Sequence, residues 1–218
     1  MKIAAFFDFD KTLLRVDSAS IGFRYLWERR EISAGYLLKV AVAGQLYRRD
    51  WLSMEAISEL CLRFYKGRRL AEFTAGAQEY CEKYLKPYLS PIILAKIEEH
   101  RRAGHYLVLL SASVDYYVEW FGRELDFNRV ICSRLAEDDA GFLTGRSVGP
   151  LFLGKHKKTA AESLAHEEGI DLRASFAYAD HHSDLPLLES VGHPVVIRPS
   201  RPLRAEALRR GWPILAEE

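Results

Sequence analysis

The sequence predicts an α/β fold, a doubly wound parallel sheet with an inserted all-helical cap domain. Three observations lead to this fold class: an apolar segment at residues 3–7, alternating strand and helix patterns after Pro87, and a helical stretch without a convincing strand between them. Strands that alternate with helices form parallel sheets that helices cover on both faces. We therefore expect a Rossmann-like core domain of residues 1–15 and 87–218, and a cap domain of residues 16–86.

Each element follows from its local pattern. Residues 3–7, Ile-Ala-Ala-Phe-Phe, have the continuous apolar character of a strand buried on both faces. Residues from about 17 to 86 are rich in Leu, Ala, Glu, Arg and aromatic side chains, which favours helices. The elements expected after this stretch are, in order, a helix over 91–103 ending at Gly104, a strand over 106–110, a helix over 114–124, a strand over 129–132, a hairpin over 133–148, a helix over 157–168 ending at Gly169, a strand over 175–179, a helix from about 184, and a strand over 195–198.

Composition limits the function classes. The 218 residues are 49% apolar, enough for a sizeable core, and the formal net charge of +1 gives no overall field that would attract nucleic acid or a membrane. A group of four arginines near the C-terminus is expected to be the solvated face of a helix rather than a nucleic-acid site. These are Arg201, Arg204, Arg209 and Arg210.

The location is expected to be cytoplasmic. No apolar signal-peptide segment precedes Asp8, and the stretch 36–47, which contains Lys39, is too short to span a bilayer of about 30 Å. The three cysteines have no CxxC spacing, which indicates free, mostly buried thiols in a reducing compartment. We expect no membrane partner, and a monomer or a homodimer.

Polar groups follow three of the predicted strands. The first runs into Asp8-Phe9-Asp10-Lys11-Thr12, the second into Ser111-Ala112-Ser113, and a later one into Asp180-His181-His182-Ser183-Asp184. Ligands bind outside the carboxyl ends of parallel strands, so these groups should meet in one crevice. Helix capping explains one or two such residues, for example Asp184 before Pro186. It does not explain a cluster of carboxylates, whose repulsion only protonation or a bound cation relieves.

Ligands that are all oxygens favour a hard cation, Mg²⁺ before Ca²⁺. Because Mg²⁺ usually binds through one or two carboxylates and a substrate phosphate, phosphoryl chemistry is the natural hypothesis. A fixed ammonium would help to neutralise the phosphate. Lys155-His156-Lys157-Lys158 opens a predicted helix, where positive charge opposes the helix dipole, although lysines in this position are often only solvated surface.

These residues resemble the motifs of the haloacid dehalogenase (HAD) superfamily of aspartate-nucleophile phosphatases. Phe7–Leu13 resembles the first motif, DxDxT; Ser111 resembles the second, Lys157 the third, and Asp180 with Asp184 the fourth. The four motifs occur in the family's order and cover nearly the whole chain. The helical insertion and the Gly-x-x-Lys form of Gly154 to Lys157 resemble the phosphoserine-phosphatase-like branch, whose cap is helical.

The resemblance implies a role for each motif residue. Asp8 would attack phosphorus and form an aspartyl-phosphate, and Asp10 would protonate the leaving oxygen and then activate water. Asp8, the backbone carbonyl of Asp10 and Asp180 would ligate Mg²⁺, and Asp184 would orient the coordination shell. Ser111 would bind a phosphoryl oxygen, and Lys157 would balance charge, with Lys155 and Lys158 as alternatives. The residues expected to contact substrate are Thr12, Asp17, Ser111, Ala112, Ser113, Lys157 and His181; Thr12 would also steady the first loop.

The substrate is less determined. Asp17 either reads an ammonium group, as a glutamate does in phosphoserine phosphatases, or simply caps a helix. Arg63 is out of register with the arginine that holds the serine carboxylate in that family. The admissible substrates are small organic phosphates: phosphoserine-like compounds, amino-alcohol phosphates, histidinol phosphate or a lipid-like phosphate. Aromatic residues of the cap should mostly pack between its helices.

Two questions stay open at this point, the role of two histidines and the activity of the chain. His181 and His182 either contact the substrate and tune Asp180, point to solvent, or belong to a His–His–Asp transition-metal site. The chain would be a phosphatase, a phosphotransferase with an acceptor other than water, or a non-catalytic binding or regulatory protein that kept the fold. An acid such as Asp10 has no purpose in mere binding, which favours catalysis.

Overall fold

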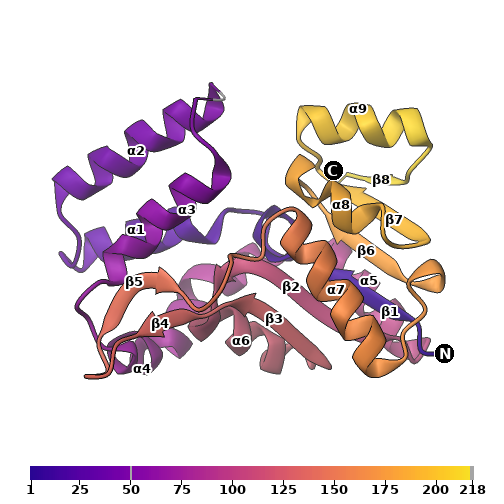
Figure 1. The fold of residues 1–218 in the computed structure, drawn as a ribbon, viewed down its shortest axis with the longest axis horizontal. Coiled ribbons are helices and arrows are strands. Elements are labelled where there is room, and N and C mark those ends of the chain that lie inside the picture. The colour runs from indigo at the N-terminus through magenta and orange to yellow at the C-terminus, as the bar shows by residue number, and fades with distance from the viewer. Residues whose placement is uncertain (50, 217–218) are drawn as a thin grey trace.

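The computed structural model describes residues 1–49 and 51–216, and a parallel β-sheet forms its centre (Figure 1). The sheet has six strands in the order β3-β2-β1-β6-β7-β8, and every neighbouring pair is parallel. A separate antiparallel pair, β4 with β5, confirms the predicted hairpin. The strands are β1 (Ala4–Phe7), β2 (Tyr106–Val114), β3 (Arg129–Ser133), β4 (Leu135–Glu137), β5 (Leu143–Ser147), β6 (Phe176–Ala179), β7 (His193–Ile197) and β8 (Ile214–Leu215).

The helices fall into an inserted group and a group that covers the sheet. Helices α1 to α4 lie between β1 and α5 in the chain, and in Figure 1 three of them, α1 to α3, stand apart from the sheet. The inserted helices are α1 (Ser18–Glu28), α2 (Ala34–Arg48), α3 (Met54–Leu62) and α4 (Leu70–Tyr80). The others are α5 (Pro91–Arg102), α6 (Asp115–Glu124), α7 (Lys155–Glu168), α8 (Leu185–Leu188) and α9 (Arg201–Arg210).

Both faces of the sheet are buried, as the apolar strand patterns predict. In β1, Ala5 and Phe7 pack into a core that includes Ile93 of α5 and Phe121 of α6. The alternate residues of β1 point to the opposite face and pack with residues of α7, α8 and α9, because successive side chains of a strand face opposite ways. The predicted doubly wound arrangement is therefore confirmed.

Several boundaries differ from the sequence prediction. Strand β7, for example, begins at His193, two residues before the predicted start at Val195. Strand β2 continues to Val114 instead of ending at Leu110, because it keeps pairing with β3 past an irregularity and reaches Ser133; Ser111 thus lies inside the strand. Helix α7 begins at Lys155, two residues early, and ends at Gly169 with φ 67°, as expected for a C-terminal glycine. Strand β8 was not predicted, because two residues carry no periodicity.

The inserted segment leaves and rejoins the core at one point. Leu14 and Leu89 form an antiparallel bridge, and Ser90 N–H donates to the carbonyl of Leu13 at 2.9 Å. The base of the segment also rests on the core, since the rings of Tyr80 in α4 and Tyr117 in α6 have centroids 5.9 Å apart. The cap limits 16–86 stay a prediction, and this neck lies close to both of them.

Two composition-based expectations can be compared with the structure. All three cysteines are free; Cys81 and Cys132 are buried, and Cys61 is partly buried. Arg209 and Arg210 of α9 are exposed and pair with Glu206 on the same helix, as expected for a solvated helix face. Across residues 1–49 and 51–216, no helix has the length and apolar character needed to cross a membrane.

The approach of two chain segments at Gly192 gives a stability prediction. A Cβ at Gly192 would lie 1.6 Å from the carbonyl oxygen of Arg173, and Gly192 N–H already donates to the carbonyl of Leu172 at 2.9 Å. We expect Gly192→Ala to lower the free energy of unfolding by roughly 3 kcal/mol, the upper range for overpacking. Urea titration of the parent and the variant measures this change in the free energy of unfolding.

Gly44→Ala is the matched control for this substitution. Gly44 lies inside α2, and a Cβ added there would meet no described atom within 4 Å beyond the backbone of its own helix. Alanine at this position should therefore raise the free energy of unfolding by up to about 1 kcal/mol. A Gly192→Ala protein as stable as the parent would contradict the close approach.

Candidate active site

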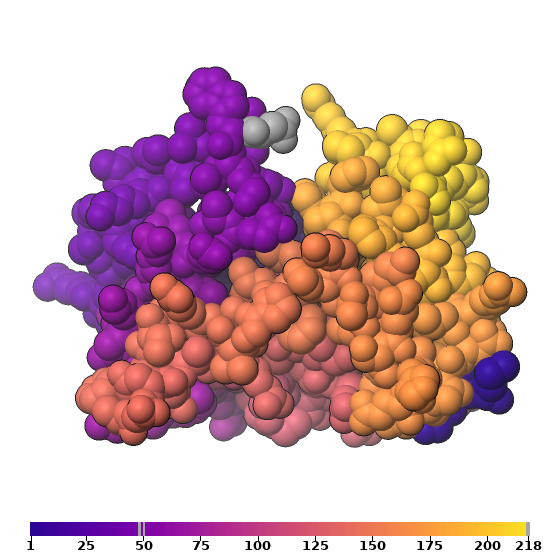
Figure 2. Space-filling model, in the orientation of Figure 1, coloured from indigo at the N-terminus to yellow at the C-terminus, as the bar shows by residue number. Residues whose placement is uncertain are grey.

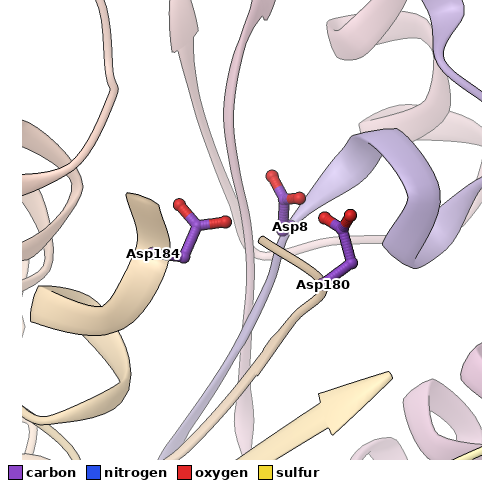
Figure 3. A group of neighbouring side chains, drawn as sticks. All are labelled: Asp8, Asp180 and Asp184. Atoms are coloured by element: carbon purple, nitrogen blue, oxygen red, sulfur yellow. The ribbon is translucent and has the colours of Figure 1, made fainter. Parts of the chain in front are cut away.

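Three buried carboxylates meet at one edge of the sheet. Asp8 follows β1, Asp180 follows β6, and Asp184 ends the short helical turn His182–Asp184. One oxygen of each lies within 4.8 Å of the others, and Figure 3 shows the three groups turned toward a common space. They meet because β1 and β6 are adjacent parallel strands whose carboxyl ends share that edge.

Lys157 is the cation paired with this cluster. Its Nζ lies 2.6 Å from Asp8 Oδ1 and 2.9 Å from Asp184 Oδ1, and its side chain is 3% exposed. Although burial alone would lower the pKa of Lys157, Asp184 and Asp8 raise it above its usual value. Lys157 is thus charged, and it is the lysine of the predicted group that enters the cluster. Lys158 instead pairs with Glu162 on the surface.

One ammonium does not neutralise three carboxylates. Burial, followed by the charges of Asp8 and Asp184, raises the pKa of Asp180 to about 8. Burial also raises the pKa of Asp8, against the opposing effect of Lys157. A compact set of oxygen donors with excess negative charge fits a divalent metal ion with a preference for oxygen.

Histidine does not join this cluster. Among the described residues, the three aspartates are the only group of three or more His, Cys, Asp or Glu side chains placed to hold a metal ion. His181 Nε2 instead lies 3.0 Å from the hydroxyl of Tyr47, and its Nδ1 accepts from Ser183 N–H at 3.2 Å. His182 is exposed. The His–His–Asp alternative is therefore not formed.

Asp10 turns its side chain away from the three carboxylates. Its Oδ1 accepts a hydrogen bond from Ser18 N–H at 2.5 Å, and its Oδ2 accepts one from the Ser113 hydroxyl. Burial, followed by the charge of Asp17, raises the pKa of Asp10 to about 7, although the two donors act in the opposite direction. A carboxyl group in this environment exchanges a proton near neutral pH.

The first loop is held by a contact of Thr12, which was expected to steady it, and by contacts of Arg198, which sequence reasoning missed. Lys11 has φ 54°, in the left-handed region, and the Arg198 guanidinium donates to its carbonyl at 2.9 Å. The hydroxyl of Thr12 is 3.4 Å from Asp8 Oδ2 and donates to it. Arg198 directly follows β7, another parallel strand that ends at this edge, and that position was the available signal.

A cavity of about 1250 Å³ lies beside these residues, between the inserted helices and the sheet edge. Figure 2 shows the surface hollowed between the purple inserted segment and the orange and yellow C-terminal part. Most of the predicted site residues line it, whereas Thr12, which is fully buried, does not. Those that line it are Asp8, Asp10, Asp17, Ser111, Ala112, Ser113, Lys157, Asp180, His181 and Asp184.

The helical wall of the cavity is aromatic and acidic. Asp17 lines it and also caps α1, since its Oδ1 accepts from Ser20 N–H at 3.0 Å. Among the described residues, Arg29 is the cationic side chain that the inserted segment contributes to the cavity, and its Nε donates to Glu31 Oε1 at 2.7 Å. Arg63 does not line the cavity. The aromatic residues contributed by the inserted segment are Phe23, Tyr25, Tyr47, Phe64, Tyr65, Phe73 and Tyr80.

A parallel α/β sheet with a carboxylate cluster at its carboxyl edge is the arrangement of a ligand-binding or catalytic domain. The sequence profile of haloacid dehalogenase-like hydrolases matches residues 5–189. The chain belongs to this family. The matched range includes all of the aspartates described above and Lys157.

Three named relatives match nearly the whole chain. The inhibition of morphological differentiation protein of Streptomyces azureus is 34% identical over 98% of this chain and 78% of its own length. A phosphoserine phosphatase of Mycobacterium tuberculosis is 31% identical over 97% of this chain and 70% of its own. The histidinol-phosphatase of Neisseria meningitidis serogroup C is 27% identical over 99% of both chains.

Solved structures show the same fold. A protein of unknown function from Bordetella pertussis Tohama I has a TM-score of 0.87 at 25% identity, with 99% of this chain and 98% of that chain covered. A phosphoserine phosphatase solved as a phospho-aspartyl intermediate analogue has a TM-score of 0.73 at 20% identity, with 100% and 94% covered. At that identity the second likeness concerns the fold alone.

The charge imbalance of the cluster predicts an unusual response to Asp180→Asn. Ionisation of Asp180 is disfavoured in the folded state, where its pKa rises from 3.8 to about 8. The metal-free protein should therefore lose stability as pH rises across that interval. We expect Asp180→Asn to have a higher Tm than the parent at pH 8 in EDTA, and to lose the rise in Tm that Mg²⁺ gives the parent.

Thermal unfolding with EDTA and with Mg²⁺ measures both effects. Asp139→Asn, in the exposed turn of the β4–β5 hairpin, makes the same chemical change outside the site and should behave as the parent. A parent that Mg²⁺ does not stabilise, or an Asp180→Asn protein that is less stable than the parent in EDTA, would contradict the electrostatic argument.

Proposed function

We propose that the chain is a magnesium-dependent phosphomonoester hydrolase that acts on a small organic phosphate through an aspartyl-phosphate at Asp8. The supporting observation is the position of two carboxyl groups at one cavity. Asp8 lies with the carboxylate cluster and Lys157, whereas Asp10 lies apart from it with a pKa of about 7. A nucleophile beside an ammonium, and a separate acid/base group that exchanges a proton near neutral pH, are what two-step hydrolysis needs.

The reaction would proceed in two displacements. Asp8 attacks phosphorus, the bond to the ester oxygen breaks, and Asp10 gives its proton to that oxygen. Water then attacks the phosphorus of the aspartyl-phosphate, and Asp10 takes a proton from it as the bond to Asp8 breaks. The second step restores both side chains and releases inorganic phosphate, so that one water is consumed in each cycle.

The remaining residues would bind the metal ion and the phosphate and balance their charges. Asp8, Asp180 and the carbonyl of Asp10 would hold Mg²⁺, with Asp184 orienting the shell; when bound, the ion supplies positive charge opposite the phosphate oxygens. Ser111, almost fully buried at the cavity wall, would donate to a phosphoryl oxygen. The ammonium of Lys157 would balance the charges of Asp8 and the phosphate.

The cavity supports a leaving group that carries an amine. Its helical wall offers Asp17 and aromatic rings, and its cation there, Arg29, is paired with Glu31. An ammonium is attracted by both carboxylates and ring faces, whereas a carboxylate finds no unpaired cation in the described part of this wall. Amino-alcohol phosphates and histidinol phosphate therefore fit better than phosphoserine. Histidinol-phosphatase and phosphoserine phosphatase among the relatives support a small amine-bearing substrate.

Two other functions use the same residues. Transfer of the phosphoryl group to an acceptor other than water would share the first displacement, and product analysis with added alcohols separates it from hydrolysis. A protein that binds ligands without catalysis would not capture beryllium fluoride in a Mg²⁺-dependent manner.

The proposed location is the cytoplasm. Three free thiols and a small phosphorylated metabolite as the proposed partner support it.

Loss of the nucleophile should abolish turnover. Asp8→Asn keeps the shape of the side chain but cannot form an aspartyl-phosphate, so we expect hydrolysis of p-nitrophenyl phosphate with Mg²⁺ to fall by more than about a thousandfold. Steady-state assay of released nitrophenol measures it, with Asp139→Asn as a control for the same substitution at an exposed site. A robustly active Asp8→Asn enzyme would end the proposal.

Asp17→Asn tests the preference for an amine. With wild-type protein we expect kcat/KM for phosphoethanolamine or histidinol phosphate to exceed that for phosphoserine by about tenfold or more, because a carboxylate meets an acidic wall. The substitution should reduce this ratio by raising KM for the amine-bearing substrates. An unchanged ratio would remove Asp17 from substrate recognition while leaving the chemistry at Asp8 untouched.

A further inference from the structure

The two oxygens of Asp10 are held by donors from different parts of the chain. Ser18, which donates through its backbone N–H at 2.5 Å, is the first residue of the inserted helix α1. Ser113, which donates through its hydroxyl, lies near the end of β2 in the core. Because a carboxylate with both oxygens bonded cannot turn about its last bond without losing a donor, these contacts fix its orientation.

The network continues behind these two serines. The hydroxyl of Ser18 is 3.4 Å from that of Ser113 and 3.2 Å from that of Tyr117 in α6. The Tyr80 hydroxyl donates to the carbonyl of Ser18 at 3.0 Å. Ser18, Tyr80 and Tyr117 are at most 6% exposed. Polar groups buried among aromatic rings are costly unless each has a partner, and here each hydroxyl has one.

The direction of the hydrogen bonds follows from the carboxylate at the end of the network. An ionised Asp10 only accepts, so the Ser113 hydroxyl donates to it and accepts in turn. The Ser18 hydroxyl can supply that proton, and the Tyr117 hydroxyl can supply Ser18. The result is a row of donors, Tyr117 to Ser18 to Ser113, that ends on Asp10 Oδ2.

We propose that Ser113 and Tyr117 are positioning residues that align Asp10 for protonation of the leaving oxygen. The inference rests on the proposed function, in which Asp10 gives that proton. Ser18 and Tyr80 come from the inserted segment, whereas Ser113 and Tyr117 come from the core. The alignment of Asp10 therefore depends on the contact between the start of α1 and α6. Neither tyrosine nor Ser18 belongs to the four motifs at the sheet edge.

The test compares leaving groups. Nitrophenolate leaves with little need of a proton, whereas the alkoxide of phosphoethanolamine needs one. Because kcat/KM reports only steps through formation of the aspartyl-phosphate, the second displacement does not enter it. We expect Ser113→Ala and Tyr117→Phe to lower kcat/KM for phosphoethanolamine about tenfold to hundredfold more than kcat/KM for p-nitrophenyl phosphate. The ratio of the two values is the readout.

Two control variants accompany the test. Tyr178→Phe removes a buried hydroxyl whose partner is His100 Nε2 at 2.8 Å, outside both the network and the cavity lining, and should keep the wild-type ratio. Ser113→Thr keeps the hydroxyl and should restore the ratio that Ser113→Ala loses. Thermal unfolding establishes whether each variant is folded. If Ser113→Ala does not fold, Tyr117→Phe tests the inference instead.

The outcomes separate this inference from the proposed function. A folded Ser113→Ala or Tyr117→Phe enzyme that loses activity equally on both substrates, or on neither, overturns the positioning role and leaves the phosphatase intact. Wild-type protein that hydrolyses neither substrate with Mg²⁺ overturns the phosphatase itself. A selective loss on phosphoethanolamine, reproduced more strongly by Asp10→Asn, supports the role.

Discussion

Crowding of like charge at the sheet edge is the constraint on which the site depends. Three buried carboxylates, with one oxygen of each within 4.8 Å of the others, share a single ammonium, so their full ionisation requires more positive charge than the chain supplies there. A divalent ion would supply this positive charge, and it would leave the ion and Lys157 together to balance a phosphate bound beside them. In the proposed mechanism the same crowding would explain why the Asp10 side chain stands apart, because an acid that must hold a proton is better placed away from the ammonium of Lys157.

The fold makes this crowding possible at moderate cost. Side chains of β1 and β6 are packed on both faces, and this packing fixes the ends of the two strands although the residues beyond them repel. The first turn of α7 brings Lys157 to the same point, and Arg198 holds the carbonyls of the first loop from the end of β7. Four separate stretches of chain therefore oppose the repulsion. Stability of the sheet is what allows an unfavourable cluster of charge to persist.

Sequence reasoning reached the sheet and the charged residues because both leave a local pattern. Apolar runs predict buried strands, and the aspartates after β1 and β6 are read directly from their positions at strand ends. A contact from a side chain to a distant backbone group leaves no local sequence pattern. For this reason the hydrogen bond from Arg198 to the carbonyl of Lys11 was missed. Tyr117 was equally invisible, since an aromatic residue of an amphipathic helix is expected to pack, and only the structure shows its hydroxyl 3.2 Å from that of Ser18. The extension of β2 through Ser111 depends on pairing with β3, and the polar residues of this stretch have no apolar pattern that would predict a strand.

Among the described residues, the inserted segment donates to Asp10 at one place and contacts His181 at another, and this links recognition to chemistry. At one, Ser18 of α1 donates to Asp10; at the other, the hydroxyl of Tyr47 in α2 is 3.0 Å from His181, the neighbour of Asp180. The cavity wall that would meet the leaving group is built from the same helices. A leaving group that holds α1 and α2 against the core would also hold the acid in place, so binding energy from groups far from phosphorus would be expressed in the rate of the first displacement. In such an arrangement a substrate that fits the wall poorly is a slow substrate as well as a weak one.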